Sequence, residues 1–293
     1  MFDLIGVPPQ VLFGQLTLGV INGAFYAMLS LGLAVIFGLL NVINFTHGAQ
    51  YMMGAFAAWM LLTFAGIPYW GALVLAPIAV GAIGIVIERL MLRRLYHLDH
   101  LYGLLLTFGL ALVFEGVFRS QFGSSGKPYD NPIPGGSNLG FMFLPNYRAW
   151  VVAFSVAVCF ATWFLIERTK LGSYLRAATE RPELVQAFGI NVPRMITLTY
   201  GFGVGLAALA GVLAAPIYQV APTMGSNLII VVFAVVVIGG MGSILGSILT
   251  GFGLGVVEGL TKVFYPEASS TVIFVIMAIV LVLKPAGLFG TPR

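Results

Sequence analysis

The sequence predicts an all-α fold: a polytopic transmembrane helical bundle of about eight membrane segments with two discontinuous or re-entrant elements, in one domain over residues 1–293. Composition is the first reason, because 59% of the residues are hydrophobic and only 8% are charged, whereas about 25% of a soluble domain is charged. The second reason is that the apolar runs approach about 20 residues, the length that a helix needs to cross a bilayer. A membrane β-barrel would instead show alternating segments of about 10 residues.

The eight membrane segments are separated by polar or glycine-rich stretches. Glycine lowers helix stability by about 1 kcal/mol relative to alanine, so the run GGMGSILG at 239–246 predicts a break inside the seventh segment. The expected segments lie at residues 11–40, 48–64, 71–92, 101–122, 150–166, 195–217, 228–260 and 271–283.

The basic residues indicate which connections face the cytoplasm, because Lys and Arg are enriched in the cytoplasmic loops of membrane proteins. They cluster at 88–100 and 167–194, which predicts that both regions are cytoplasmic. Counting segments from these regions places the N-terminus, the Gly- and Pro-rich loop 123–147 and the region 216–227 outside. The net charge of +4 therefore reports topology and does not indicate a nucleic-acid partner.

The side on which the chain ends depends on the seventh segment. If 228–260 crosses once, Lys284 and Arg293 lie outside; if it dips to the glycine run and returns, they lie inside. The positive-inside rule favours the second alternative, because it places the two positive charges of Lys284 and Arg293 on the cytoplasmic side. A break in each half, at 41–48 and 239–246, also resembles the paired discontinuous helices of transporters built from two repeats.

The stretch 167–194 is the longest polar interruption of the chain. Residues 171–180 can form one short helix. A second helix is expected from Pro182 to Phe188, because proline suits the first helical position and Gly189 suits the position just past the end.

The second short helix is expected to be amphipathic. Leu184, Val185 and Phe188 would share one apolar face, and such a face on a solvated helix predicts a docking surface for a cytosolic protein. The alternative is a surface loop that lies on the membrane.

Polar residues at membrane depth form a second candidate site. Such groups often mark a transport path, and irregular backbone at that depth must be buried in protein or line a wet cavity. The alternative role of the polar residues in the run NFTHG is structural, by satisfying the broken backbone. The candidate path residues are Asn44, Thr46, His47, Gly239, Gly240, Gly242 and Glu258.

The run RAATERPELVQAFGIN resembles the cytoplasmic coupling loop of ABC-importer permeases of the branched-chain amino acid type. Other runs resemble further signatures of this family in the family's order, and the resemblance extends over nearly the whole chain, to the smaller of the family's two permease subunits. These runs are YAMLSLGLAVIFGLLNVINFTHGAQYMMGA, ERLMLRRLYHLDHLYGLLLTFGLALVFEG, FAVVVIGGMGSILGSILTGFGLGVVEG and LKPAGLFG. Leu184 and Val185 depart from the small residues usual in the family. The matching positions of the coupling loop are Arg176, Ala177, Pro182, Glu183, Gly189, Ile190 and Asn191.

The resemblance implies a division of labour in a bacterial inner membrane. This chain would pair with a second, homologous or identical permease subunit, while two cytosolic ATP-binding subunits use ATP and Mg²⁺ and a periplasmic binding protein delivers the solute. The chain itself is then not an enzyme and is expected to bind no cofactor, metal or nucleic acid; no GxxxxGK[ST] phosphate loop occurs in it. The residues expected to contact the ATPase are Arg176, Ala177, Pro182, Glu183, Leu184, Phe188, Gly189 and Ile190.

Two other functional classes fit the sequence less well. A self-sufficient secondary transporter or channel would commonly hold charged residues at mid-membrane, whereas most charges here lie at segment ends. A membrane enzyme would need a catalytic cluster such as HExxH, which is absent from the sequence. The resembling family handles branched-chain and other amino acids, urea, amides and aromatic acids, so the solute stays open.

Several remaining features are expected to be structural. Glu115 and Arg119 are spaced i, i+4 and predict a side-chain pair. The turn that holds His97, Asp99 and His100 is expected to be solvated rather than to bind a metal. Glycines spaced by four permit close helix contact, either inside the subunit or with a second permease subunit; they are Gly201 and Gly205, and Gly251, Gly255 and Gly259.

Overall fold

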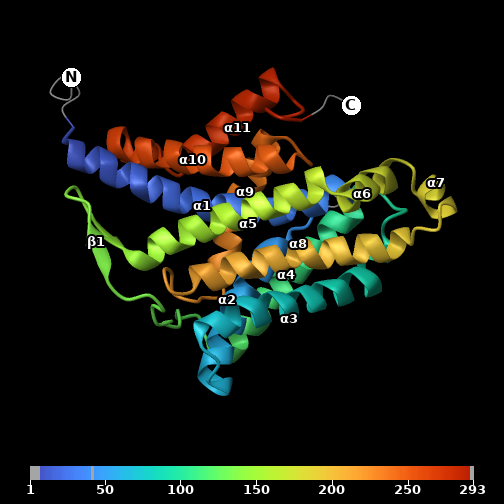
Figure 1. Ribbon diagram of the computed structural model, residues 1–293, viewed down its shortest axis with the longest axis horizontal. Helices are drawn as coiled ribbons and strands as arrows, with labels where there is room; N and C mark the ends of the chain where they lie inside the picture. The colour runs from blue at the N-terminus through green and yellow to red at the C-terminus, as the bar shows by residue number, and fades with distance from the viewer. Residues whose placement is uncertain (1–6, 41–42, 291–293) are drawn as a thin grey trace. The chain divides into compact units, whose positions relative to one another are not determined.

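The computed structural model describes residues 7–40 and 43–290, and most of the described chain is helical (Figure 1). Asn41 and Val42, which belong to the first predicted break, lie outside the described residues. The α-helices are α1 (Pro9–Leu40), α2 (Thr46–Ala65), α3 (Tyr69–Leu90), α4 (His100–Phe122), α5 (Asn146–Arg168), α6 (Lys170–Glu180), α7 (Pro182–Ala187), α8 (Val192–Ala214), α9 (Met224–Gly239), α10 (Ile244–Phe264) and α11 (Val272–Leu283). The 3-10 turns within the described residues are η2 (Leu92–Arg94) and η3 (Pro266–Ala268).

The predicted all-α, multi-pass architecture is confirmed. Among the described helices, α1, α3, α4, α5, α8 and α10 are long and apolar enough to cross a membrane. Helix α2 has 20 residues, whereas α9 and α11 are shorter apolar helices. Each predicted segment coincides with a helix to within a few residues, and the seventh is divided into α9 and α10 at the glycine run, as predicted.

The chain forms two compact units, each assembled from separate stretches of sequence. The first unit contains residues 1–30, 131–159 and 231–293, and the second contains 31–130 and 160–230. That these units act as a single permease domain stays a prediction.

The core of the second unit consists of α2, α3 and α8, whose backbones approach closely at glycines. A Cβ atom at Gly54 of α2 would overlap the backbone of Ala208 in α8. A Cβ atom at Gly81 of α3 would lie 3.0 Å from the carbonyl oxygen of Gly201 in α8. Small residues allow this approach, so Gly201 serves packing within the subunit.

In the first unit, α1 and α10 lie side by side (Figure 1). A Cβ atom at Gly19 would lie 2.6 Å from the carbonyl oxygen of Gly255, and one at Gly23 would lie 3.2 Å from that of Gly251. Residue numbers rise along α1 as they fall along α10, so the two helices are antiparallel. The glycine stripe that ends at Gly259 therefore packs inside the subunit.

Loops that were predicted on the outer side lie together within each unit. In the second unit, the N–H of Lys127 donates to the carbonyl of Val220 at 2.8 Å, and that of Val220 donates back at 3.0 Å. In the first unit, the ring of Phe141 packs against Phe13 near the start of α1, with centroids 5.7 Å apart. Both contacts agree with the topology that the basic residues predict.

The outer loop also contains a structure that the sequence does not predict. The strands β1 (Gly136–Asn138) and β2 (Phe143–Pro145) form an antiparallel pair. Each strand has three residues, too few to show the alternation of apolar and polar side chains by which strands are identified.

Candidate functional site

The coupling loop, residues 167–194, is fixed to the end of α5 through α6. A guanidinium nitrogen of Arg176 donates to the carbonyl of Ile166 at 2.9 Å and pairs with Glu167 at 3.3 Å. Both charged side chains are more than 40% exposed, so the ion pair itself contributes little. Gly172 permits the close approach, because a Cβ atom there would overlap the backbone of Ile166.

Helix α7 is anchored by one apolar side chain, and two other apolar side chains, one on the helix and one just past its end, are exposed. Val185 is buried and packs with Ala178 of α6 and Val192 of α8. Leu184 is 54% exposed and Phe188 is 78% exposed. The loop thus presents a pair of apolar side chains, Leu184 and Phe188, that the described residues leave largely uncovered; they are called the exposed pair below.

The prediction that Leu184, Val185 and Phe188 share one face is wrong for Val185. At about 3.6 residues per turn, Val185 lies about 100° from Leu184 around the helix, whereas Phe188 lies about 40° from it. The 100° offset turns Val185 toward α6 and α8. The predicted helix end is also one residue late, because α7 ends at Ala187; Gly189 follows with a positive φ of 82°, as predicted.

Asn191, a matching position of the resemblance, and the remaining predicted contact residues lie on the same loop. Asn191 caps α8, since its side-chain oxygen accepts from the N–H of Arg194 at 3.1 Å. Ile190 is half-buried against the Val185 cluster. The predicted residues that lie exposed on the loop are Arg176, Ala177, Pro182, Glu183 and Gly189.

A buried carboxylate lies behind the coupling loop, and sequence reasoning did not single it out. Glu88 at the end of α3 has no exposed surface. It accepts hydrogen bonds from Thr197 of α8 at 2.7 Å and from the phenol of Tyr96 at 3.0 Å. Burial, and then the charge of Glu88, raise the pKa of Tyr96, so the phenol stays protonated and donates. The feature of the sequence that could have identified Glu88 is an acidic residue at the end of an apolar run.

The NFTHG segment is held in the second unit by a threonine of α4. Thr46 donates to the carbonyl of Thr107 at 2.8 Å, and the N–H of Phe45 donates to the hydroxyl of Thr107 at 3.2 Å. Thr107 has no exposed surface, whereas most of α4 is exposed. This residue was missed because a lone threonine in an apolar run has no periodicity that marks it.

The polar side chains of NFTHG are buried in protein. Asn44 donates to Gln50 at 3.2 Å, and both residues are 1% exposed. His47 has no exposed surface and packs over Gly32, where a Cβ atom would lie 2.9 Å from the imidazole carbon Cε1. Among the described residues Asn44 Oδ1 has no hydrogen-bond partner, whereas the amides of Asn44 and Gln50 face the buried hydroxyl of Tyr200. Gln50 is thus a further polar member of this site.

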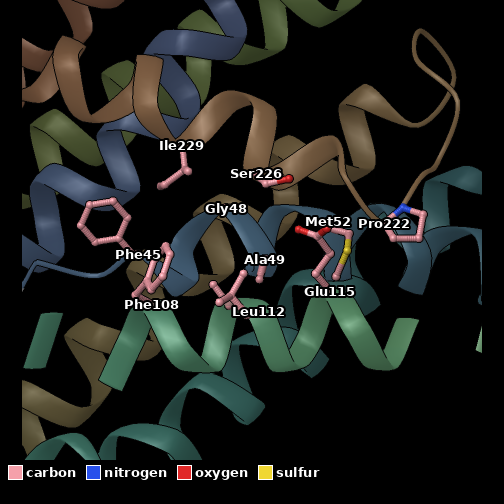
Figure 2. A pocket seen from close by; sticks show the side chains of 12 residues that line it. Phe45, Gly48, Ala49, Met52, Phe108, Leu112, Glu115, Pro222, Ser226 and Ile229 are labelled. Carbon is pink, nitrogen blue, oxygen red and sulfur yellow. The ribbon is translucent and has the colours of Figure 1, made fainter. Parts of the chain in front are cut away.

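A small cavity borders NFTHG between α2, α4 and the start of α9 (Figure 2). Its volume is about 60 Å³, which is room for a few water molecules. The walls are mainly apolar, and Glu115 and Ser226 contribute the polar side chains. Glu115 pairs with Arg119 at 2.5 Å, which confirms the predicted pair.

In the first unit, the break between α9 and α10 is closed by the C-terminal tail. Gly240 and Gly242 have positive φ angles of 103° and 91°, which glycine adopts without strain. The N–H groups of Leu288 and Phe289 donate to the last carbonyls of α9, at 2.8 and 3.1 Å. The tail therefore satisfies carbonyls that a helix end leaves without partners.

Glu258 lies apart from this break, about 21 Å along α10 from Ile244 at about 1.5 Å per residue. It accepts from the phenol of Tyr26 at 2.6 Å and from Lys262 at 2.5 Å. Glu258 thus links α1 and α10 rather than joining Gly240 and Gly242. The predicted proximity of NFTHG to the glycine break stays a prediction.

The turn before α4 has a capping role. The Asp99 side chain accepts from the N–H of Leu101 at 2.9 Å, as an N-cap residue does. Among the described residues, no three His, Cys, Asp or Glu side chains are grouped so that they could hold a metal ion.

The chain is similar in sequence to known membrane proteins over most of its length. Residues 15–281 match the family described as branched-chain amino acid transport system / permease component. The high-affinity branched-chain amino acid transport system permease protein BraD of Pseudomonas aeruginosa is 30% identical over 95% of this chain and 96% of its own. LivH of Escherichia coli is 31% identical over the same shares. A probable LivH of Methanocaldococcus jannaschii is 28% identical over 90% of this chain and 88% of its own. The chain therefore belongs to the permease component family of branched-chain amino acid transport systems.

Proposed function

We propose that this chain is the membrane permease subunit of an ATP-driven importer for branched-chain or related amino acids in a bacterial inner membrane. It pairs with a second permease subunit and two cytosolic ATP-binding subunits. A periplasmic binding protein delivers the solute. The permease provides the path and performs no chemistry of its own.

The observation that carries this proposal is the exposed pair on the coupling loop. Leu184 and Phe188 lie in the longest polar connection of an otherwise apolar chain, on and just past the end of a helix that Val185 anchors to α6 and α8. An anchored helix with two uncovered apolar side chains suits a partner that supplies a matching groove. The relatives are named as permeases of branched-chain amino acid transport systems, which supports the choice of solute.

The path is proposed to run past NFTHG. Asn44 Oδ1 is a buried polar atom without a partner among the described residues, and such a group favours a bound polar molecule. The neighbouring cavity of about 60 Å³ is too small for an amino acid, so this arrangement corresponds to a closed path. Opening requires α2, α4 and the start of α9 to separate.

Reconstitution tests this function. The permease pair, the ATP-binding subunits and the binding protein are incorporated with ATP in proteoliposomes, and initial uptake of labelled L-leucine, L-phenylalanine and urea is measured. The proposal predicts uptake of leucine that requires both ATP and the binding protein. Uptake by the permease alone, driven by an ion gradient, would instead establish a secondary transporter.

A further inference from the structure

A cavity of about 490 Å³ lies directly behind the coupling loop, within the second unit. It is lined by the end of α3 with the turn after it, by α6 and α7, and by the start of α8. Small-molecule sites typically have volumes of about 300–1,000 Å³. The path proposed above does not use this cavity, because the residues that line it are different from those around NFTHG.

The cavity is lined by groups of opposite charge from different elements. Arg93 in the turn after α3 supplies a positive charge, with the imidazole of His97 as a further hydrogen-bonding group, and Glu183 of α7 supplies a negative charge. The ion pairs of the described chain are Glu115–Arg119, Glu167–Arg176 and Glu258–Lys262, so Arg93 and Glu183 do not pair with each other. A cation and a carboxylate that line one cavity without pairing leave room for a molecule that bears both complementary charges.

The start of α8 contributes apolar side chains to the same cavity. Val192 and Ile196 of α8 line it, and Val192 is part of the cluster around Val185. The buried carboxylate of Glu88 also borders the cavity, but Thr197 and Tyr96 already donate to it. Arg93, His97 and Glu183 thus share the cavity with an aliphatic surface formed by Val192 and Ile196.

We propose that this cavity binds an aliphatic α-amino acid that arrives from the cytosol. Its carboxylate is held by Arg93 and His97, its ammonium group by Glu183, and its side chain lies on Val192 and Ile196. Guanidinium–carboxylate contacts give both strength and geometric specificity. The inference rests on the proposed function only in taking the transported solute as the ligand.

Occupancy of the cavity would restrain the coupling loop. The ligand bridges α7, which carries the exposed pair, to the turn after α3. A bridge that is made best in one arrangement of these elements stabilises that arrangement. The cavity is thus a feedback site, at which accumulated amino acid slows the importer from the inner side.

Direct binding is the first test. The full chain in lipid nanodiscs is titrated with L-leucine, with 4-methylpentanoate, which lacks the ammonium group, and with 3-methylbutylamine, which lacks the carboxylate. Leucine should bind at least tenfold more tightly than either analogue, and Arg93→Gln should weaken leucine binding at least tenfold. The matched control is Arg94→Gln, because Arg94 is exposed on the same turn and does not line the cavity. No leucine binding, or equal binding by Arg93→Gln, would overturn the site.

The second test separates the site from the proposed function. Proteoliposomes with the complete transporter are loaded with 0 or excess L-leucine, and ATP-driven uptake is measured with wild type, Arg93→Gln and Arg94→Gln. Internal leucine should slow uptake by wild type and by Arg94→Gln severalfold, and it should leave uptake by Arg93→Gln unchanged. If internal leucine does not change the rate of ATP-driven uptake by wild type, feedback is refuted while the transporter function stands. If leucine uptake itself fails, the proposed function falls, and the nanodisc titration still decides whether the site exists.

Discussion

Thr197 on α8 donates a 2.7 Å hydrogen bond to the buried carboxylate of Glu88 at the end of α3. This bond joins the two helices whose ends lead into the two predicted cytoplasmic regions. A hydrogen bond to a charged group contributes about 1.5–3 kcal/mol. It therefore stabilises the packing of α3 against α8, the helix that directly follows the coupling loop.

Replacing Thr197 by the nearly isosteric valine should lower the melting temperature of the purified protein by a few degrees, because it leaves one oxygen of Glu88 without a donor. Thermal unfolding in detergent, followed by the loss of a monodisperse peak, measures the effect. Thr261→Val is the control, since the Thr261 hydroxyl only donates to a carbonyl of its own helix, that of Val257. Equal shifts in the two variants would contradict the role given to Glu88.

The antiparallel contact of α1 with α10 predicts opposite outcomes for two glycines of one helix. A Cβ atom at Gly255 would overlap the backbone of α1, whereas one at Gly253 would meet nothing within 4 Å. Gly255→Val should therefore cost about 1–3 kcal/mol, in the range of overpacked cores, and Gly253→Val should be nearly neutral. The yield of folded protein and its thermal stability distinguish these outcomes; similar losses in both would disprove the contact.

Single cysteines test the topology in a Cys159→Ala background. Ser125→Cys and Ser137→Cys, in the predicted outer loop, should react with an impermeant thiol reagent applied to intact cells. Because α10 runs antiparallel to α1, whose start is predicted outside, α11 returns inward and Lys284→Cys should react only after the membrane is opened. Labelling of Lys284→Cys in intact cells would show that 228–260 crosses once.

The proposed path predicts that His47→Ala lowers the initial uptake rate severalfold with little change in expression. Gly242→Val should impair uptake more, because the positive φ of 91° at Gly242 strains a branched residue. Gly116→Val is the control, since a side chain at this position of α4 meets nothing within 4 Å. Normal transport by both His47→Ala and Gly242→Val would contradict a role of these residues in the transport path.

The membrane segments could be predicted because the length of an apolar run is a local property of the sequence. The glycine break likewise needed only the cluster GGMGSILG. Contacts between distant residues could not be predicted in this way: Thr107 is one hydroxyl in an apolar run, and the tail that caps α9 joins residues about fifty positions apart. The orientation of Val185 was misjudged because short helices have too few residues for their faces to be assigned before their neighbours are known.

The central claim is that the exposed pair of the coupling loop binds the ATP-hydrolysing subunit. Co-purification of that subunit with tagged permease tests it most directly, comparing wild type, Phe188→Asp and Leu98→Asp. Leu98 is a matched control, because it is 50% exposed in the other predicted cytoplasmic region. We predict that Phe188→Asp reduces recovery of the ATPase at least tenfold, through burial of a charge in an apolar groove, while Leu98→Asp and membrane insertion are unaffected. Recovery of the ATPase at wild-type yield with Phe188→Asp would contradict the account.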